Sequence, residues 1–222
     1  NSSHVVCGLS SVVSAQRLMN PFAIFAHALR RTWDEWISAI LISCLWLLAQ
    51  VLIVTGPPAT ATLCAMARRT YDGEYWTAAD AWAAFRELFG PAWLWAVPNI
   101  LVIGLSLYNI NTFWNLPGGM WSGLRVVWLL GLLVWLALNL FYWPFYLAAE
   151  DRSLRNTYAN CARFWLLHPA TALVLFVVCL ALGVVSLPFA LPIVLGAIFW
   201  IALVAEVAVR RSLNKLTTDS HG

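Results

Sequence analysis

The residue types that most often perform chemistry are scattered along this sequence. The four histidines, His4, His27, His168 and His221, are isolated from one another and from any cysteine pair. No HExxH, GxSxG or glycine-rich phosphate-binding pattern occurs, and the carboxylates are not clustered. The sequence therefore predicts no catalytic residue, no metal site and no cofactor, and we expect a protein that is not an enzyme.

Four polar residues interrupt long hydrophobic stretches: Gln50, Asn99, Asn139 and Glu206. A polar or ionisable side chain inside a membrane helix is costly and is a functional candidate. Gln50, Asn99 and Asn139 are typical of hydrogen bonds between neighbouring helices. Glu206 has two interpretations, either a role in moving a solute or a pair with Arg210, which lies four residues further along the helix.

Aromatic residues gather in the stretch 109–123, NINTFWNLPGGMWSG. Trp114 and Trp121 have side chains able to stack on sugar rings, but tryptophan is also typical of the boundary between membrane and water. We expect this stretch to be the one long loop on the outer side of a membrane, with both tryptophans as candidates for either role.

The composition predicts that membrane helices carry all of these residues. Hydrophobic residues make up 62% of the 222 positions and charged residues only 10%, whereas a soluble domain has about 25% charged residues. The net charge of +3 is far from that of a nucleic-acid-binding protein, so no nucleic-acid partner is expected. The expected fold class is an all-α integral membrane protein whose first partner is the lipid bilayer.

Apolar stretches alternate with amphipathic ones along the chain. Amphipathic helices are expected from Asn20-Pro21, from Thr77, which forms a capping-box pattern with Asp80, and over 154–161. Pro144 is expected to kink its helix. The short stretch 59–69 has small residues that allow close packing inside a bundle. The predicted crossings are 36–54, 59–69, 92–108, 126–149, 170–187 and 193–209.

The distribution of Lys and Arg predicts six crossings rather than five. If 59–69 returns across the membrane, twelve of the 13 Lys and Arg residues lie on one side and only Arg125 lies on the other. With five crossings, seven Lys and Arg residues lie on one side and six on the other, a division that favours neither orientation in the membrane. Because cytoplasmic loops collect Lys and Arg, we expect six passes in a bacterial inner membrane with both termini cytoplasmic.

These elements predict a six-helix bundle built from three helical hairpins, each preceded by a cytoplasmic amphipathic helix. The three units form a weak internal repeat. They make up a single membrane domain over 19–215, with a disordered extension over 1–18 and a disordered tail over 216–222. Arginines of the amphipathic helices and helix ends are candidates for docking a partner protein, although basic amphipathic helices also lie on anionic lipid. The docking candidates are Arg30, Arg31, Arg68, Arg69, Arg86 and Arg163.

The stretch 20–91, which begins at Asn20-Pro21, resembles the YesL-like family of bacterial membrane proteins. In that family an apolar helix runs into a turn of the GPATAAL type, here Gly56, Pro57, Ala59 and Thr60 with an additional proline, Pro58. A basic pair and an acidic Gly-Glu element follow, here RRTYDGE over 68–74, and then an aromatic-basic helix, here WAAFRELF over 82–89. The resemblance implies a bacterial inner-membrane protein of unknown function, often encoded near carbohydrate-uptake systems, and it supplies no catalytic residues.

The function expected from this resemblance is that of a non-catalytic accessory component of carbohydrate uptake, with sugar-importer permease subunits as partners. The alternative is a stand-alone transporter of small solutes. A transporter should have a polar path through the middle of the bundle, whereas an accessory protein should have a dry interior and a functional surface at one face. A membrane-embedded enzyme is a third class, and no motif supports it.

Overall fold

The computed structural model describes residues 20–114, 116, 118–186 and 196–219, with side chains as far as residue 214. Within these residues the chain forms ten α-helices and no strand, which confirms the all-α prediction. The helices are α2 (Pro21–Asp34), α3 (Trp36–Val51), α4 (Gly56–Asp72), α5 (Ala78–Glu87), α6 (Phe89–Trp114), α7 (Gly119–Leu140), α8 (Tyr142–Ala148), α9 (Leu154–Leu167), α10 (Pro169–Ser186) and α12 (Ala197–Asp219).

The amphipathic helices α2, α5 and α9 begin at capping residues. The side chain of Asn20 accepts a hydrogen bond from the backbone N–H of Phe22 at 3.0 Å, and Pro21 follows in the first turn. Thr77 and Asp80 form a complete capping box at the start of α5. Both predicted helix starts are therefore confirmed. Ser153 caps α9 in the same way, because its hydroxyl accepts from the backbone N–H of Asn156 at 3.3 Å.

Three helical segments are long and apolar enough to cross a membrane: α6, α7 continued by α8, and α10. A fourth is available if α2 and α3, which bend by 92° at Glu35, count as one broken span. The membrane character of the chain is thus supported by three or four described helices. α4, with 17 residues, and α12, which carries Glu206, Arg210 and Arg211, are not among them.

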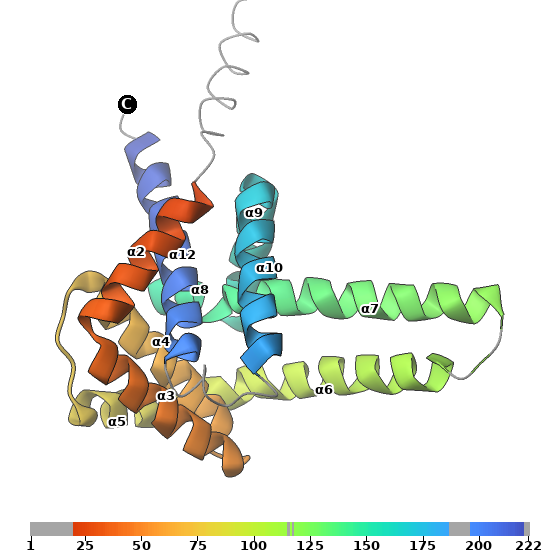
Figure 1. Ribbon diagram of the computed structural model, residues 1–222, viewed down its shortest axis with the longest axis horizontal. Helices are drawn as coiled ribbons and strands as arrows, with labels where there is room; N and C mark the ends of the chain where they lie inside the picture. Colours follow the sequence, from red (N-terminus) through yellow and green to blue (C-terminus); the bar gives the residue numbers. More distant parts are fainter. Residues whose placement is uncertain (1–19, 115, 117, 187–195, 220–222) are drawn as a thin grey trace, which may run out of the picture.

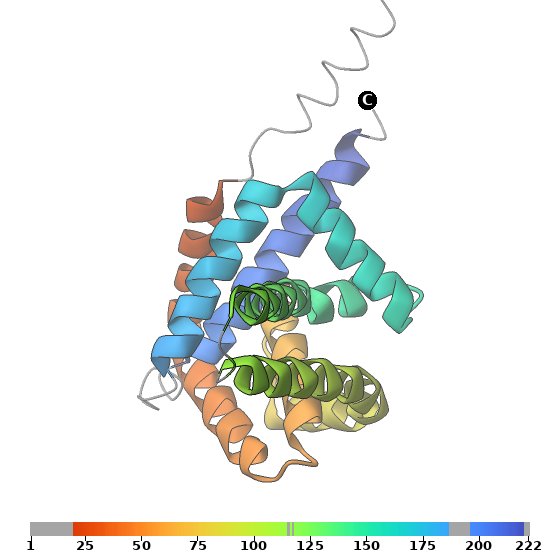
Figure 2. The ribbon, with the colours of Figure 1, turned by 90° about the vertical axis from the view of Figure 1, so that its right-hand side faces the viewer.

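The helices around α4 and α12 form the body of the molecule, from which one hairpin projects. α12 packs against α2, α3, α4, α8 and α10. α6 and α7 pair with each other and run out of this body, across the direction of α10 and α12 (Figure 1). Figure 2 looks along this hairpin and shows the other helices passing behind its base. The structure thus pairs α3 with α4, α6 with α7 and α10 with α12, but it does not place the three pairs side by side as expected.

A buried aromatic cluster lies at the base of the hairpin, where α7 meets α8 and α9. α7 ends at Leu140 and α8 restarts at Tyr142, so the expected kink lies at Phe141, three residues before Pro144. Proline has no N–H to donate to the preceding turn, which explains a break there. Phe141 and Tyr142 are at most 1% exposed, and Phe141 packs on Phe164 of α9 with ring centroids 4.7 Å apart.

Small residues bring α4 and α12 together in the core. Ala61 and Ala67 of α4 and Val204 and Ala208 of α12 are fully buried. This agrees with the expectation that the short stretch 59–69 packs inside the protein rather than against lipid. The helix is longer than expected, because it begins at Gly56 and continues to Asp72.

Two predicted boundaries change in the structure. The stretch 109–123 was expected to be a long loop, but α6 continues to Trp114 and α7 begins at Gly119, so most of it is helical. The polar side chains of Asn109 and Thr112 donate to the carbonyls of Leu105 and Tyr108, four residues earlier, so the end of α6 accommodates them. α12 extends to Asp219, past residue 215, where the membrane domain was expected to end. The predicted extension 1–18, residues 220–222 of the predicted tail and the proline turn at 188–192 lie outside the described residues.

Candidate functional site

The turn motif at Gly56 joins α3 to α4 through side chains. Thr60 donates to the carbonyl of Gly56 at 3.1 Å and accepts from the indole N–H of Trp46 on α3 at 2.9 Å. The amide of Gln50 also donates to the Gly56 carbonyl, at 3.3 Å. Gln50, predicted to bond between helices, therefore does so at the end of α3.

Gly56 is needed for space rather than for a sharp bend. It is the first residue of α4 and does not have a positive φ, and the chain turns earlier, over residues 52–55. A Cβ at position 56 would lie 2.8 Å from Oε1 of Gln50. The close approach of the Gln50 amide is therefore the reason that this position requires a glycine. Pro57 occupies the first turn of α4, where no backbone N–H is required, and Ala59 is buried.

A buried ion pair links the end of α4 to α12. Arg210 donates through Nε to Glu206 at 2.9 Å and through Nη2 to Asp72 at 3.1 Å. Glu206 is only 1% exposed, so its charge is almost completely removed from solvent. The Arg210 guanidinium also lies 5.9 Å from the ring centroid of Tyr71. The predicted pair of Glu206 with Arg210 is present, whereas the partnership with Asp72 could not be read from sequence spacing.

Two atoms of this cluster retain unused hydrogen-bonding capacity. Oε2 of Glu206 and Nη1 of Arg68 are buried and have no hydrogen-bond partner within the described part of the chain. Arg68 was predicted to be free for docking, but it lies half-buried beside the cluster. A carboxylate with one paired and one unpaired oxygen can accept a further donor, so this cluster is the ionisable candidate site of the structure.

The second polar site lies at the base of the α6–α7 hairpin and has a reciprocal geometry. The indole N–H of Trp95 on α6 donates to Oδ1 of Asn139 on α7, and that of Trp135 on α7 donates to Oδ1 of Asn99 on α6, each at 2.8 Å. Each asparagine also donates to the carbonyl of the tryptophan four residues earlier on its own helix. The predicted role of Asn99 and Asn139 in bonding between helices is therefore confirmed.

Tyr158 of α9 closes this network from the side. Its hydroxyl accepts from the Asn99 amide at 3.3 Å and donates to Oδ1 of Asn139 at 3.0 Å. Its ring stacks on Trp135 with centroids 5.1 Å apart. Burial raises the pKa of Tyr158 above its usual value, which keeps the phenol neutral and able to donate. Every polar group of this network is paired, so the network holds the three helices together and has no hydrogen-bonding group left over for a solute.

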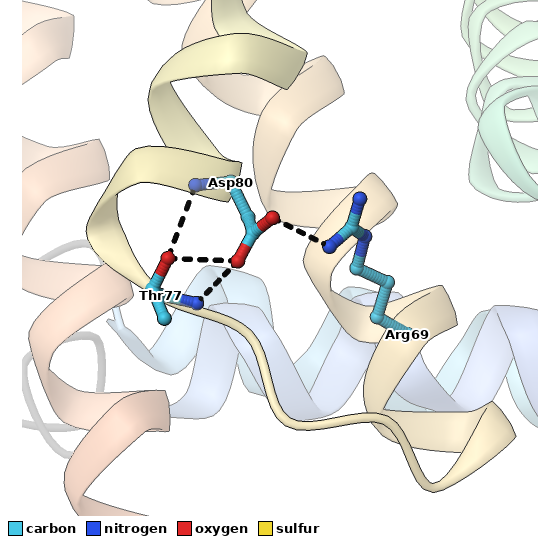
Figure 3. A network of polar contacts seen from close by, with 3 residues as sticks. All are labelled: Arg69, Thr77 and Asp80. Carbon is cyan, nitrogen blue, oxygen red and sulfur yellow. Dashed lines mark hydrogen bonds and ion pairs between the residues drawn. The ribbon is translucent and has the colours of Figure 1, made fainter.

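A third set of contacts fixes α5 against α4. In Figure 3, the Asp80 carboxylate accepts from the backbone N–H and the hydroxyl of Thr77, each at 2.8 Å, and faces the Arg69 guanidinium. The Arg69–Asp80 ion pair is 3.0 Å long. The hydrogen bonds from Thr77, more than the ion pair, hold the pKa of Asp80 below its usual value. Arg69, predicted as a docking candidate, is therefore paired with Asp80 within the protein, although its side chain is 41% exposed.

The remaining docking candidates lie at the surface. Arg30, Arg86 and Arg163 are exposed, and Arg31 is partly exposed. Among the described residues none of these four forms an ion pair. They lie on the three amphipathic helices α2, α5 and α9, so the predicted cationic surface exists for four of the six arginines.

The aromatic side chains at the tip of the α6–α7 hairpin contact other residues of the same hairpin. Trp121 stacks on Phe113 with centroids 5.4 Å apart, which joins the ends of α7 and α6. The Arg125 guanidinium lies 5.5 Å from the ring centroid of Trp114 and donates to the Trp114 carbonyl at 3.4 Å. One face of each tryptophan is thus already occupied. This arrangement favours closing and anchoring the hairpin over stacking on a sugar.

The chain matches no family model, no curated protein and no solved structure. Within the described residues, no group of three or more His, Cys, Asp or Glu side chains is placed to hold a metal ion. The polar relationships that the sequence did not reveal, Trp95–Asn139, Trp135–Asn99 and Arg210–Asp72, join residues that are 36 to 138 positions apart. Only the Trp-x-x-x-Asn spacing, which occurs once on α6 and once on α7, could have indicated the first two.

Proposed function

We propose that this chain is a multi-pass protein of the bacterial inner membrane that acts as a non-catalytic accessory component of a carbohydrate importer. The observation that supports this role is the pairing of the polar side chains at the base of the α6–α7 hairpin. Asn99, Asn139 and Tyr158 pair with one another and with indole groups. The grooves between helices are lined almost entirely by apolar side chains. Such an interior suits a protein that supports transport by partner subunits.

The proposed topology has six passes, made by α3, α4, α6, α7 with α8, α10 and α12, and cytoplasmic termini. It is supported by the twelve-to-one division of Lys and Arg. α4 spans only about 25 Å at 1.5 Å per residue, less than the roughly 30 Å hydrocarbon core, but its burial in the protein compensates for its length. Crossing the same bilayer as α10 would require the α6–α7 hairpin to rotate from its place in Figure 1. The chain breaks at Leu88 and Phe141 are the two points where that rotation would occur.

Cysteine labelling from outside the cell tests this topology. In a background without the five native cysteines, Ser122→Cys at the hairpin tip should react with a membrane-impermeant maleimide. Glu74→Cys, in the exposed connection between α4 and α5, should react only after the membrane is permeabilised. Labelling of Glu74→Cys in intact cells would show that α4 does not return and would leave five passes.

The accessory role rests on the exposed arginines of α2 and α9 as the docking surface. Arg with nearby aromatic residues is a composition that favours protein interfaces. The test is purification of the tagged protein from its own host in mild detergent, followed by mass spectrometry. Permease subunits should be recovered, and the charge reversals Arg30→Glu and Arg163→Glu should reduce their recovery. Arg125→Glu is the matched control for charge reversal, because Arg125 lies near the tip of the α6–α7 hairpin and not on α2 or α9. If the protein is recovered alone and its deletion leaves the uptake of all tested sugars unchanged, the proposal is wrong.

A stand-alone transporter is the second candidate, and one observation favours it. Oε2 of Glu206 and Nη1 of Arg68 are buried and find no partner among the residues that the structure describes, as in sites that exchange a proton or a polar solute. Purified protein in proteoliposomes should then move a solute on its own, and Glu206→Gln should abolish that movement. If transport requires permease subunits, or if Glu206→Gln has no effect on it, the accessory role is favoured.

A further inference from the structure

A groove with apolar walls runs between α3, α4 and α5. Its volume is about 260 Å³, and its walls include Leu41, Leu45 and Trp46 from α3 and Trp82 and Phe85 from α5. Leu41, Leu45 and Trp82 are 54%, 50% and 58% exposed, so the groove is open along one side. We refer to it as the α5 groove.

Three polar side chains in the walls of the α5 groove, Trp46, Thr62 and Trp76, already have partners. The indole N–H of Trp46 donates to Thr60 at 2.9 Å, and that of Trp76 donates to Thr70 at 3.0 Å. The hydroxyl of Thr62 donates to the Pro58 carbonyl at 2.8 Å. An occupant of the groove therefore gains little from polar groups of its own inside it. This chemistry matches an alkyl chain.

One unbalanced positive charge lies at the rim of the α5 groove. The Arg86 guanidinium is 5.9 Å from the ring centroid of Trp82, which lines the groove. The nearby carboxylates are already paired, Asp80 with Arg69 at 3.0 Å and Glu87 with Arg152 at 3.1 Å. Arg86 itself forms no ion pair within the described residues. The rim is therefore complementary to an anionic group.

The wall formed by α5 is held in place from its first turn. The capping box of Thr77 and Asp80, together with the ion pair to Arg69, fixes the start of α5 on α4 (Figure 3). Trp82 stacks on Phe85 with centroids 5.4 Å apart, which gives the groove a continuous aromatic side. A preformed groove binds a flexible chain at lower cost than one that must be ordered on binding.

We propose that the α5 groove binds an anionic phospholipid, with an acyl chain between α3 and α5 and the phosphate at Arg86. The apolar walls account for the chain, and the unpaired guanidinium accounts for the negative head group. A zwitterionic lipid carries an amine beside its phosphate, so it gains less binding free energy from the charge of Arg86. This site does not depend on the proposed role in carbohydrate uptake, because it requires no partner protein.

The test compares two lipids with identical acyl chains on the delipidated full-length protein. Native mass spectrometry in a non-ionic detergent measures retention of phosphatidylglycerol and of phosphatidylcholine. We expect the wild type to retain phosphatidylglycerol about fivefold better, the preference that one arginine near a head group provides. Arg86→Gln should remove this preference, and Arg86→Lys should retain it. Glycerol 3-phosphate, which has the head-group charge without the chain, should not displace the bound lipid.

Two further variants separate the α5 groove from general adhesion of lipid. Ala81→Trp places a large ring in the groove and should lower retention of both lipids. Arg163→Gln removes the charge of another exposed arginine, on α9, and should change the retention of neither lipid. Circular dichroism and the melting temperature confirm that each variant folds. Equal retention of the two lipids by the wild type, or an equal effect of Arg86→Gln and Arg163→Gln, would overturn the proposal. Displacement of the bound lipid by glycerol 3-phosphate, or by a second copy of the chain, would also overturn the proposal.

Discussion

The indole N–H of Trp95 on α6 donates to the side-chain oxygen of Asn139 on α7 at 2.8 Å. The same bond joins Trp135 of α7 to Asn99 of α6, so the two helices exchange equivalent contacts about the base of their hairpin. Neither bond has a substitute in an apolar surrounding, where an unpaired polar group is costly. The exchange therefore fixes the register of α6 on α7.

The first prediction concerns this exchange. Asn139→Leu removes the acceptor of both Trp95 and Tyr158, and we expect it to lower the free energy of unfolding by about 1 to 3 kcal/mol. Asn109→Leu is the matched control, because Asn109 is only partly buried on the same hairpin and bonds to its own helix. Denaturant titration in detergent, followed by circular dichroism, measures both. In a double-mutant cycle Trp95→Phe and Asn139→Leu should be coupled by about 1 kcal/mol. Independent effects would show that the bond does not set the register.

The local structure of this chain was largely predictable, because it depends on neighbouring residues. Asn20 with Pro21 and Thr77 with Asp80 cap helices through contacts that span no more than three positions. The pair of Glu206 with Arg210 follows from one helical turn. In such cases the residue types and their spacing determine the contact, and no knowledge of the tertiary fold is needed.

The arrangement of the helices was not predictable on the same basis. Asp72 and Arg210 are 138 positions apart, and only the packing of α12 on α4 brings them together. The crosswise hairpin depends on how the aromatic side chains around Phe141 interlock, which hydrophobic periodicity does not specify. Arg68 and Arg69 were assigned to the surface by charge alone, whereas their environment is set by the neighbouring elements α12 and α5.

The second prediction concerns Gly56. Gly56→Ala should be tolerated, with a loss below about 1 kcal/mol, because the Gln50 amide can move away from the new methyl group. Gly56→Leu should be destabilising by about 1 to 3 kcal/mol, since a branched side chain does not fit between α3 and α4. Gly104→Leu is the control, as a Cβ there meets no atom within 4 Å. Ala39 is only 1% exposed and is therefore unsuitable as a control. Melting temperatures in detergent measure all three, and equal losses at positions 56 and 104 would contradict the role of Gln50.

The third prediction concerns the pH dependence of the start of α5. The folded pKa of Asp80 is lowered, so the folded state favours the ionised carboxylate. Its stabilising effect is therefore fully present above the unfolded pKa of about 4 and is lost as the pH falls through the folded value. Hydrogen exchange of the α5 amides, corrected for intrinsic rates, should accelerate in that acidic window. Asp80→Asn should remove this acceleration, while Glu74→Gln, on the preceding connection, should leave it unchanged. An identical pH profile in the wild type and Asp80→Asn would refute the assignment.

The last prediction concerns the buried pair of Glu206 and Arg210. Arg210→Met leaves the Glu206 carboxylate buried without its partner, and this should cost about 3 kcal/mol or more of unfolding free energy. Asp72→Asn removes only the more exposed partner, whose side chain is 37% exposed, and should cost less than about 1 kcal/mol. Adding Glu206→Gln to Arg210→Met removes the uncompensated charge and should recover a large part of the loss. Denaturant titration of the three variants measures these differences. If Arg210→Met and Asp72→Asn are equally mild, or if Glu206→Gln recovers nothing, then Arg210 does not neutralise Glu206 and the cluster does not join α4 to α12.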